Sequence, residues 1–492
     1  MPRRFAAFAA VGATLSACDG NPDNPRQPTA TNPPIPVASV TVSPGDLSIL
    51  VGETQPLTAT TRDQAGNALV GRTVSWTTSA PAVATVTAGG SVTGVGSGSA
   101  TITATSEGKS GSATVVTLPV VAFSSVAAGG AHTCAHTSDG AAYCWGRGES
   151  GQLGIPVPTT TCQTDGGPFP CSKVPVAVRS EVSFAQLAAG GAHTCGLTSD
   201  GSAYCWGGNV SGQVGDSSFT NRDAPARVAT GLKFVRIDAG ARHTCALTSD
   251  GTAYCWGANS RGQLGDGTTS PRSAPVAVTG GLKFQQIAAG GFSIGHTCAL
   301  TTSGEVYCWG DNERGQLGSG NPDVTAHPEP ARVTSTSGLP FTAVTAGLGR
   351  HSCALTTTGA AYCWGENSFG ALGNGSNSDS PVPVPVIGGL AFVQVVAGGF
   401  IGHTCGFIAS GAAHCWGDNE VGAIGDGTST DRAQPAAVTG GLSFTSLDAG
   451  FRHNCGRVTN GAVYCWGSNG AGQLGTNSTT PLAVPTKVFG QP

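Results

Sequence analysis

The tripeptide Cys-Trp-Gly recurs seven times between residue 122 and the C-terminus, and this repetition limits the possible folds more than any other feature of the chain. Successive copies lie 50 to 61 residues apart. A unit of that length has room for about four short strands, the size of one propeller blade, and seven such units can close into a ring. We therefore expect an all-β fold with a seven-bladed β-propeller at 122–492. The repeated tryptophans, which we expect in the core between blades, are Trp145, Trp206, Trp256, Trp309, Trp364, Trp416 and Trp466.

Composition agrees with an all-β chain. The 492 residues include 76 Gly and 30 Pro but a single Met, which favours short strands joined by many turns over helices. Charged residues make up 11% of the chain, against roughly 25% in an ordinary soluble domain. The net charge is −4 and no basic stripe is present, which argues against a nucleic-acid partner.

Each unit repeats the phrases GLxFxxIAAG, HTCALT, SDGTAYCWG and NxxGQLGxG, followed by a Pro-rich link with PVxV. This pattern resembles the repeat of the regulator-of-chromosome-condensation family. The resemblance implies a propeller and, for function, guanine-nucleotide exchange on a small GTPase, the activity for which the family is named. The pair of cysteines in every unit departs from the family pattern. Since the last unit ends in PLAVPTKVFGQP with no strand after it, we expect its PTKV segment to complete the first blade and close the ring.

The spacing of the cysteines predicts disulfides. In the third unit, a three-residue turn at Ser249-Asp250-Gly251 would place Cys245 opposite Cys255, with α-carbons about 4.5 Å apart. That separation lies within the range that a disulfide bridges. The pairs expected from this register, with one further pair in the first inter-blade loop, are Cys134–Cys144, Cys162–Cys171, Cys195–Cys205, Cys245–Cys255, Cys298–Cys308, Cys353–Cys363, Cys405–Cys415 and Cys455–Cys465.

The histidine that precedes the first cysteine of each unit leaves a metal site open as an alternative. His-x-Cys and the second cysteine offer three ligands, whereas structural zinc takes four, and no Cys-x2-Cys pair is present. A redox centre would need Cys-x-x-Cys. We therefore expect no metal or other cofactor, and we expect each histidine to bond backbone at the start of its strand. These residues are His132, His193, His243, His296, His351, His403 and His453.

The N-terminus predicts export. A basic start, Met1-Pro2-Arg3-Arg4, precedes the apolar run FAAFAAVGATLSA, which has the form of a secretory signal. The run ends in Leu-Ser-Ala-Cys, which resembles the lipobox of bacterial lipoproteins and implies lipidation of Cys18 at the end of a signal peptide at 1–18. An ordinary signal with a chance cysteine is the alternative. We expect a lipid-anchored protein outside the cytoplasm, with a Pro-rich linker at 19–36.

Residues 37–117 form a separate unit of short alternating segments such as SVTVS, TVSWTT and SATITATS, divided by Gly-rich turns. Alternation with period two indicates a β-sandwich. The phrases VGETQPLTATTRDQAGN and GSVTGVGSGSATITATS resemble the bacterial Ig-like domain of group 2. By that resemblance Trp76 is a core residue, and the domain serves as a stalk.

Candidate binding residues lie at positions whose residue type varies between the units. A rigid scaffold with variable loops is typical of a binding face, although drift on a solvated turn is the alternative. The first inter-blade loop, 155–171 (IPVPTTTCQTDGGPFPC), is a second candidate because a disulfide would pre-organise it. The candidate rim comprises Glu149, Arg261, Arg314, Phe369 and Val421, together with Ser150, Ser211 and Ala471 at the matching positions and the nearby Asp311, Glu313, Glu366, Asp418 and Glu420.

No motif for catalysis is present in the sequence: it lacks His-Glu-x-x-His, Gly-x-Ser-x-Gly and a phosphate-binding loop. The leading hypothesis is therefore a non-enzymatic, lipid-anchored cell-envelope protein that binds a protein or a glycan through one propeller face. Nucleotide exchange and an enzyme that uses the propeller channel are the alternatives. A channel enzyme would need polar residues on the inner strands, whereas FxxIAAG is apolar and small.

Overall fold

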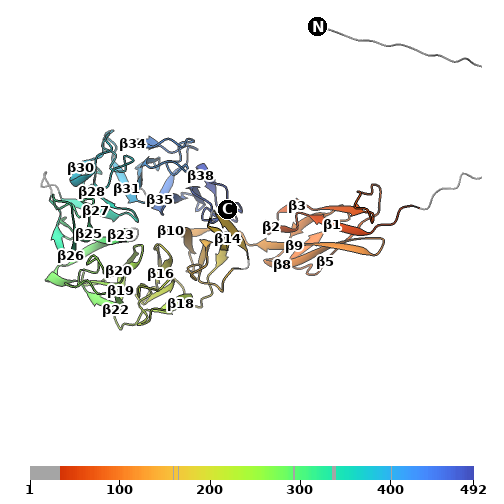
Figure 1. Cartoon of the computed structure of the whole chain (residues 1–492), viewed down its shortest axis with the longest axis horizontal. Coiled ribbons are helices and arrows are strands. Elements are labelled where there is room, and N and C mark those ends of the chain that lie inside the picture. Colours follow the sequence, from red (N-terminus) through yellow and green to blue (C-terminus); the bar gives the residue numbers. More distant parts are fainter. Residues whose placement is uncertain are drawn as a thin grey trace, which may run out of the picture.

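The computed structural model describes residues 34–158, 160–164, 166–291, 294–334, 340–399 and 402–491. These residues form two regions, an elongated N-terminal one and a disc with a central channel (Figure 1). The described elements are strands apart from one short 3-10 turn, η1 (Thr279–Gly281). Among the described residues no helix is long and apolar enough to cross a membrane.

The N-terminal region folds into three small sheets around one apolar core. Ile49, Val92, Ile102 and Val115 are fully buried, and Trp76 packs half-buried against the same cluster. One sheet pairs β1 (Ser39–Ser43) with β4 (Thr58–Arg62). The second sheet has the strand order β2 (Asp46–Leu50), β9 (Lys109–Leu118), β8 (Gly98–Ser106) and β5 (Ser75–Thr78). The third sheet has the strand order β3 (Thr54–Pro56), β7 (Ser91–Gly94) and β6 (Ala84–Val86).

The disc is built from seven antiparallel blades, as the repeat spacing predicts, and in the described residues six of them have four strands and blade 1 has five. The first strand of each blade lines the central channel, and the later strands follow outward (Figure 1). The first strands are β10 (Phe123–Ala128), β15 (Gln186–Ala189), β19 (Phe234–Ala239), β23 (Phe284–Gly291), β27 (Phe341–Ala346), β31 (Phe392–Ala397) and β35 (Phe444–Ala449). The second strands are β11 (His132–Thr137), β16 (His193–Leu197), β20 (His243–Thr248), β24 (Gly295–Thr301), β28 (His351–Thr356), β32 (His403–Ile408) and β36 (His453–Val458).

The third and fourth strands carry Cys-Trp-Gly and the Pro-rich links. The third strands are β12 (Ala142–Arg147), β17 (Ala203–Gly207), β21 (Ala253–Gly257), β25 (Val306–Asn312), β29 (Ala361–Gly365), β33 (Ala413–Gly417) and β37 (Val463–Gly467). The fourth strands are β14 (Gly167–Ala177), β18 (Arg222–Arg227), β22 (Arg272–Ala277), β26 (Asp323–Arg332), β30 (Ser380–Pro385), β34 (Arg432–Ala437) and β38 (Leu482–Lys487). Blade 1 has a fifth strand, β13 (Thr161–Thr164), at its outer edge.

The tryptophans occupy the predicted place between blades. Trp256 of blade 3 is fully buried and packs against Cys205 and Val214 of blade 2. Phe234, at the start of the same blade, lies 6.1 Å from Trp256 between ring centroids. Because each blade contributes such a tryptophan to its neighbour, the core of the disc is a ring of inter-blade contacts.

The expectation that the C-terminal strand completes the first blade is wrong. β38 pairs with β37, so the last blade contains its own fourth strand. The reason is the phase of the repeat: a blade begins at the Phe of the inner strand and ends at the PVxV link, so every unit is complete in itself. The propeller segment of the chain therefore begins and ends between blades 7 and 1.

The two ends are joined within the connection between these blades. The Phe489 amide donates to the carbonyl of Gly475 at 2.9 Å, and Thr439 makes the equivalent bond to Gly425 in blade 6. The Val121 amide then donates to the carbonyl of Gly490 at 2.7 Å. The C-terminal tail thus supplies the first half of an inter-blade connection, and the segment that follows the N-terminal region supplies the second half.

Candidate functional site

The histidines form a closed hydrogen-bonded ring around the disc. Each histidine Nε2 lies 2.9 to 3.0 Å from the side-chain oxygen of the residue that follows the histidine of the next blade. These acceptors are Thr194, Thr244, Thr297, Ser352, Thr404, Asn454 and Thr133, so the last pair, His453 with Thr133, joins blade 7 to blade 1.

The direction of these bonds fixes the tautomer. The Thr244 hydroxyl donates to the carbonyl of Gln213 at 2.9 Å, which also accepts the indole N–H of Trp256 at 3.0 Å. The hydroxyl must therefore accept from Nε2–H of His193, and Nδ1 is unprotonated. In blade 7 the side-chain amide of Asn454 replaces the hydroxyl. Its oxygen accepts from Nε2–H of His403, and its nitrogen donates to the carbonyl of Ala423.

Burial keeps the seven histidines neutral. It lowers the pKa of His193, His296, His351 and His453 to about 3 and that of His132, His243 and His403 to about 4. The prediction of a structural histidine that bonds backbone is corrected in one respect: Nε2 bonds a side chain of the neighbouring blade. Sequence reasoning treated each unit by itself and so missed a partner that only the closed ring supplies.

All eight predicted cysteine pairs are disulfides in the structure. Cys245 faces Cys255 across β20 and β21 with α-carbons 4.1 Å apart, and Leu247 faces Ala253, as the turn register predicts. The seven blade disulfides are fully buried beside the tryptophans, where they hold the second strand to the third. Among the described residues no group of three or more His, Cys, Asp or Glu is placed to hold a metal ion.

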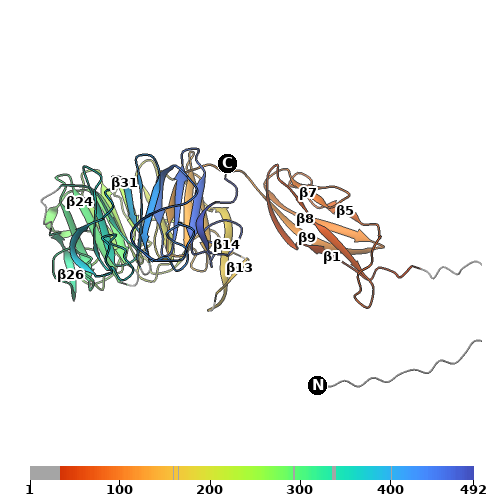
Figure 2. The same ribbon diagram turned by 90° about the horizontal axis from the view of Figure 1, so that it is seen from above.

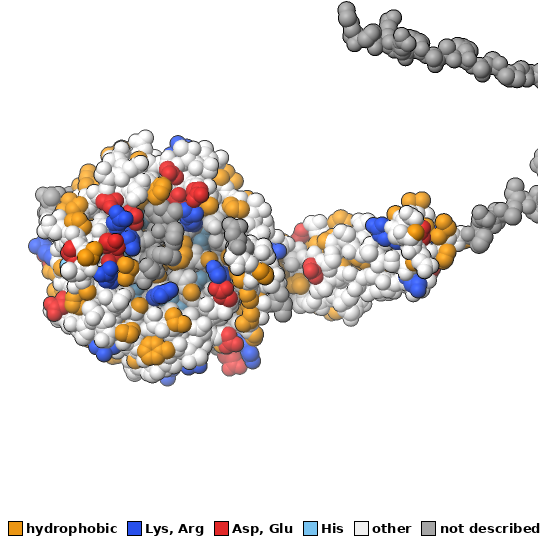
Figure 3. Space-filling model, viewed as in Figure 1, with side chains coloured by type: hydrophobic (Ala, Val, Ile, Leu, Met, Phe, Trp, Pro, Cys, Tyr) orange, Lys and Arg blue, Asp and Glu red, His pale blue; other side chains and the backbone are white. Residues whose placement is uncertain are grey.

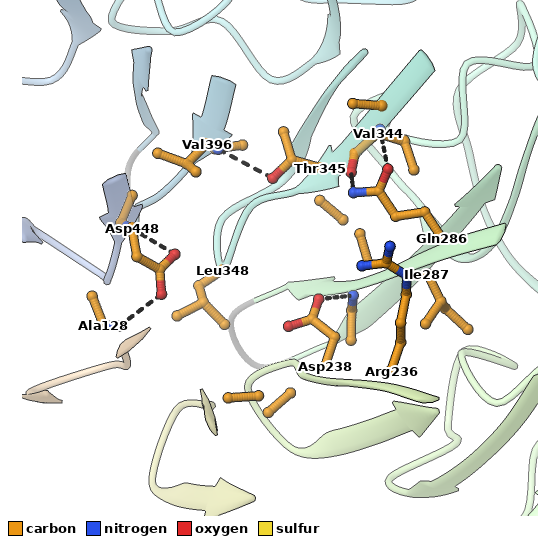
Figure 4. A pocket seen from close by; sticks show the side chains of 18 of the residues that line it. Ala128, Arg236, Asp238, Gln286, Ile287, Val344, Thr345, Leu348, Val396 and Asp448 are labelled. Atoms are coloured by element: carbon orange, nitrogen blue, oxygen red, sulfur yellow. Dashed lines mark hydrogen bonds between the residues drawn. The ribbon is translucent and has the colours of Figure 1, made fainter. Parts of the chain in front are cut away.

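The central channel encloses a cavity of about 360 Å³ and is more polar than FxxIAAG suggests. Asp238 on β19 and Asp448 on β35 face this cavity from two blades, and Arg236 lines it close to Gln286 (Figure 4). Burial raises the pKa of Asp238 to about 6 and that of Asp448 to about 7. The negative charge of Asp238 contributes to the second shift.

The polar channel residues connect neighbouring blades. The Asp238 carboxylate accepts the backbone N–H of Ala289 at 2.8 Å, and Asp448 accepts that of Ala128 at 2.8 Å. The Gln286 amide donates to the carbonyl of Val344 at 2.8 Å. Glutamines make this link from blades 2, 4 and 6, and Asp or Thr side chains make it from blades 3, 5 and 7.

Sequence reasoning missed these residues, although a signal was present. The second and fourth residues after the Phe that opens each inner strand are Gln, Arg, Asp or Thr in several units and Ala, Ser or Val in the others. A polar residue at a channel position has to satisfy its own hydrogen bonds, so its neighbours in the next blade become its partners. The channel residues thus stabilise the ring, and their arrangement gives no nucleophile with an adjacent base.

The predicted rim residues lie together on one face of the disc, which we call the rim face and define by Glu149, Arg261, Arg314, Phe369 and Val421. Charged side chains gather around the channel mouth on this face, most densely where β25 and β28 lie in Figure 1 (Figure 3). Glu149 and Arg314 are exposed, whereas Arg261, Phe369 and Val421 are half-buried. Ala471, the equivalent residue of blade 7, is buried.

Ion pairs link the charged rim residues across blades. Arg261 of blade 3 lies 3.6 Å from the buried Asp311 of blade 4, and Arg350 of blade 5 lies 3.2 Å from Glu313. Arg314 lies 3.5 Å from Asp379. A separate group pairs Arg452 with Asp418 at 3.5 Å and with Glu420 at 2.9 Å, and burial raises the pKa of Asp311, Glu366 and Asp418.

The loop predicted to lie between blades lies instead within blade 1, between β12 and β14, because the link that follows it forms the fourth strand of that same blade. Its β13 and β14 form a hairpin that extends beyond the disc (Figure 2). Cys162 and Cys171 join its strands, and Phe169 lies buried beneath the guanidinium of Arg147, 4.7 Å from the ring centroid. Phe169 also packs with Ala471 of blade 7. The hairpin is therefore pinned across the junction between the last blade and the first. Cys18 lies outside the described residues.

Comparison with known proteins agrees with this architecture. The model of the RCC1-like domain matches residues 172–491, and models of the regulator of chromosome condensation (RCC1) repeat match 123–152 and 139–197. The model of the bacterial Ig-like domain (group 2) matches 36–117.

Relatives and solved structures include several propellers. The chain is 31% identical to the human E3 ubiquitin-protein ligase HERC2 over 317 residues, which is 64% of this chain and 5% of that protein. It is 35% identical to the ultraviolet-B receptor UVR8 of Arabidopsis thaliana over 144 residues, 29% of this chain and 32% of that protein. The chain thus spans a small part of the length of the relatives that it matches.

Among solved structures, human WBSCR16 aligns with a TM-score of 0.62 at 23% identity, over 70% of this chain and 89% of that one. Prp20p of Saccharomyces cerevisiae aligns with a TM-score of 0.59 at 22% identity, over 75% and 87% of the two chains. These alignments show the fold. The chain belongs to the RCC1-like domain family and carries a group 2 bacterial Ig-like domain before its propeller.

Proposed function

We propose that this protein is an exported, lipid-anchored scaffold of a bacterial cell envelope that binds a protein or glycan partner through the rim face of its propeller and performs no catalysis. The observation that carries the proposal is the contrast between the two parts of each repeat. The histidine ring, the disulfides and the tryptophans recur in every blade, while the residue at the rim position varies among Ser, Arg, Phe, Val and Ala. Fixed scaffolds with variable loops are the usual arrangement of binding proteins.

The cysteine content supports the cellular location. Sixteen cysteines are paired in the structure, and such pairing is stable in an oxidising compartment. The Leu-Ser-Ala-Cys sequence supplies the seventeenth cysteine at the end of a signal-like segment. Nucleotide exchange on a cytosolic GTPase is disfavoured because the same segment would direct the chain away from such a partner.

Two measurements test the proposal. Intact mass under non-reducing conditions is expected to show a mature chain that starts at a lipidated Cys18 and has no alkylatable thiol. Chemical cross-linking on intact cells is expected to recover an envelope protein or glycan. An unprocessed chain with free thiols, or recovery of a cytosolic GTPase, would contradict the proposal.

A further inference from the structure

Blade 2 differs from the other blades at two neighbouring exposed positions. Val210 follows the repeated Asn of the rim turn and is 69% exposed, and Phe219 is 53% exposed. The matching residue after the Asn is Ser260, Glu313, Ser368, Glu420 or Gly470 in other blades. The position of Phe219 is occupied by Thr269, Asn377, Ser429 or Thr479 in the four blades with the same loop.

One side chain links the two segments that carry these apolar residues. The amide of Asn209, which precedes Val210, donates to the carbonyls of Ser218 and Thr220 at 3.1 and 3.0 Å, and these residues flank Phe219. Val210 and Phe219 therefore border the same rim turn, and residues 208–213 of that turn carry no charged side chain. Exposed apolar side chains that border one turn form an apolar surface of the kind that marks contact sites.

The rim turn of blade 1 stands next to this turn. The Ser150 Cβ of blade 1 lies within 3.7 Å of the Cβ position at Gly208, and Pro158 packs against Gly148. Val157, beside Pro158, is 58% exposed. The rim turns of blades 1 and 2 thus lie side by side, and Val157 belongs to the segment that leads from blade 1 into the hairpin. The hairpin itself packs on Ala471 of blade 7.

The remainder of the rim face has an excess of negative charge. From blade 3 to blade 7 seven carboxylates face five guanidinium groups, a net charge of −2 for this set. The carboxylates of a single turn also repel each other: Glu313 raises the pKa of Asp311, and Glu420 and Asp431 raise that of Asp418. The groups are Asp311, Glu313, Glu366, Asp379, Asp418, Glu420 and Asp431 with Arg242, Arg261, Arg314, Arg350 and Arg452.

We propose that the rim face docks a basic protein, which seats an apolar contact on Val210 and Phe219 beside the rim turn of blade 1 and places Lys or Arg side chains over the acidic blades 4 to 6. This inference rests on the proposed binding function and specifies its partner. An apolar centre with a charged margin is the usual anatomy of a protein interface. Charge complementarity of this kind mainly accelerates association and excludes acidic partners.

The test uses a photo-crosslinking amino acid placed at Phe219 or Val210 of the full chain, expressed in its own cell. The matched control is Val235, which is 58% exposed. It follows Phe234, whose amide bonds the Gly201 turn on the opposite face. We expect one discrete protein adduct from Phe219 and Val210 and none from Val235. We expect its isoelectric point to lie above about 9, as for other strongly basic partners.

A second arm tests the charge. In the Phe219 background, Glu313→Lys with Glu420→Lys is expected to lower the adduct yield at least fivefold, while Glu181→Lys leaves it unchanged. Adducts from Val235 alone, capture of an acidic protein or of glycan, or an unchanged yield in the charge-reversed chain would overturn the inference and leave the binding function standing. Absence of any adduct, together with failure of general cross-linking on cells, would overturn both.

Discussion

Mild acid is the sharpest perturbation for this fold because seven buried histidines must stay neutral. Each has a folded pKa of about 3 or 4 and an unfolded value of about 6.5. Between these values the unfolded chain binds more protons, so stability falls as pH falls below 6.5. When the pH falls from 7.5 to 5.5, each histidine lowers the free energy of unfolding by about 1.4 kcal/mol, and the seven together lower it by roughly 10 kcal/mol.

The two channel carboxyls act in the opposite direction. Their folded pKa values of about 6 and 7 exceed the unfolded value, so the folded chain takes up these protons first and gains stability as pH falls from 7 toward 4. Over the same pH interval, protonation of Asp238 and Asp448 raises the free energy of unfolding by about 3 kcal/mol. The net loss is about 7 kcal/mol, which is comparable with the whole stability of many domains.

The assay is urea denaturation at closely spaced pH values under non-reducing conditions, followed by tryptophan fluorescence. The slope of unfolding free energy against pH near 5.5 is expected to correspond to uptake of about five protons. His296→Gln lowers that uptake by about one proton and serves as the internal check. Equal or greater stability at pH 5.5 than at 7.5 would refute the account of the neutral ring.

Three further perturbations address single contacts. Thr244→Val leaves a histidine donor and a carbonyl without their hydroxyl partner and is expected to cost about 1–3 kcal/mol in urea denaturation, whereas Thr244→Ser, which keeps the hydroxyl, stays near wild type. Gly240→Ala would place a methyl 2.5 Å from the Cε1 of a ring histidine and is expected to lower the melting temperature by several degrees, about 2 kcal/mol or more, while Gly231→Ala, with nothing within 4 Å, has no such effect. Replacing Cys245 and Cys255 together by Ala is expected to cost about 2 kcal/mol in calorimetry, and a neutral result would mean that this bridge does not constrain the unfolded chain.

Much of the fold follows from the sequence because the repeat constrains it seven times over. The turn at Ser249-Asp250-Gly251 sets the register, and the register sets the partner of Cys245. These are local relations between residues ten positions apart, which spacing alone can describe. The same locality explains why the blade count and the position of the tryptophans were predictable.

The parts that could not be predicted depend on contacts between blades. His193 bonds Thr244 in the next unit, and Asp238 bonds the backbone of Ala289, 51 positions later. Nothing in the spacing of one unit shows that these side chains meet. The closing strand was misassigned for a related reason: PTKV could extend either blade on pattern alone, and only the phase of the inner strand decides between them.

The place where the chain ends also determines how the disc bears a mechanical load. The segment from the Ig-like domain enters the ring through Val121, which is bonded to Gly490 and accepts the side-chain amide of Gln491 at 2.6 Å. A pull on the N-terminal domain therefore reaches these bonds before it reaches β10, and the tail shares the tension. The bonds that Gly490 and Gln491 make to Val121 are therefore expected to carry part of such a force before it reaches β10, the innermost strand of blade 1.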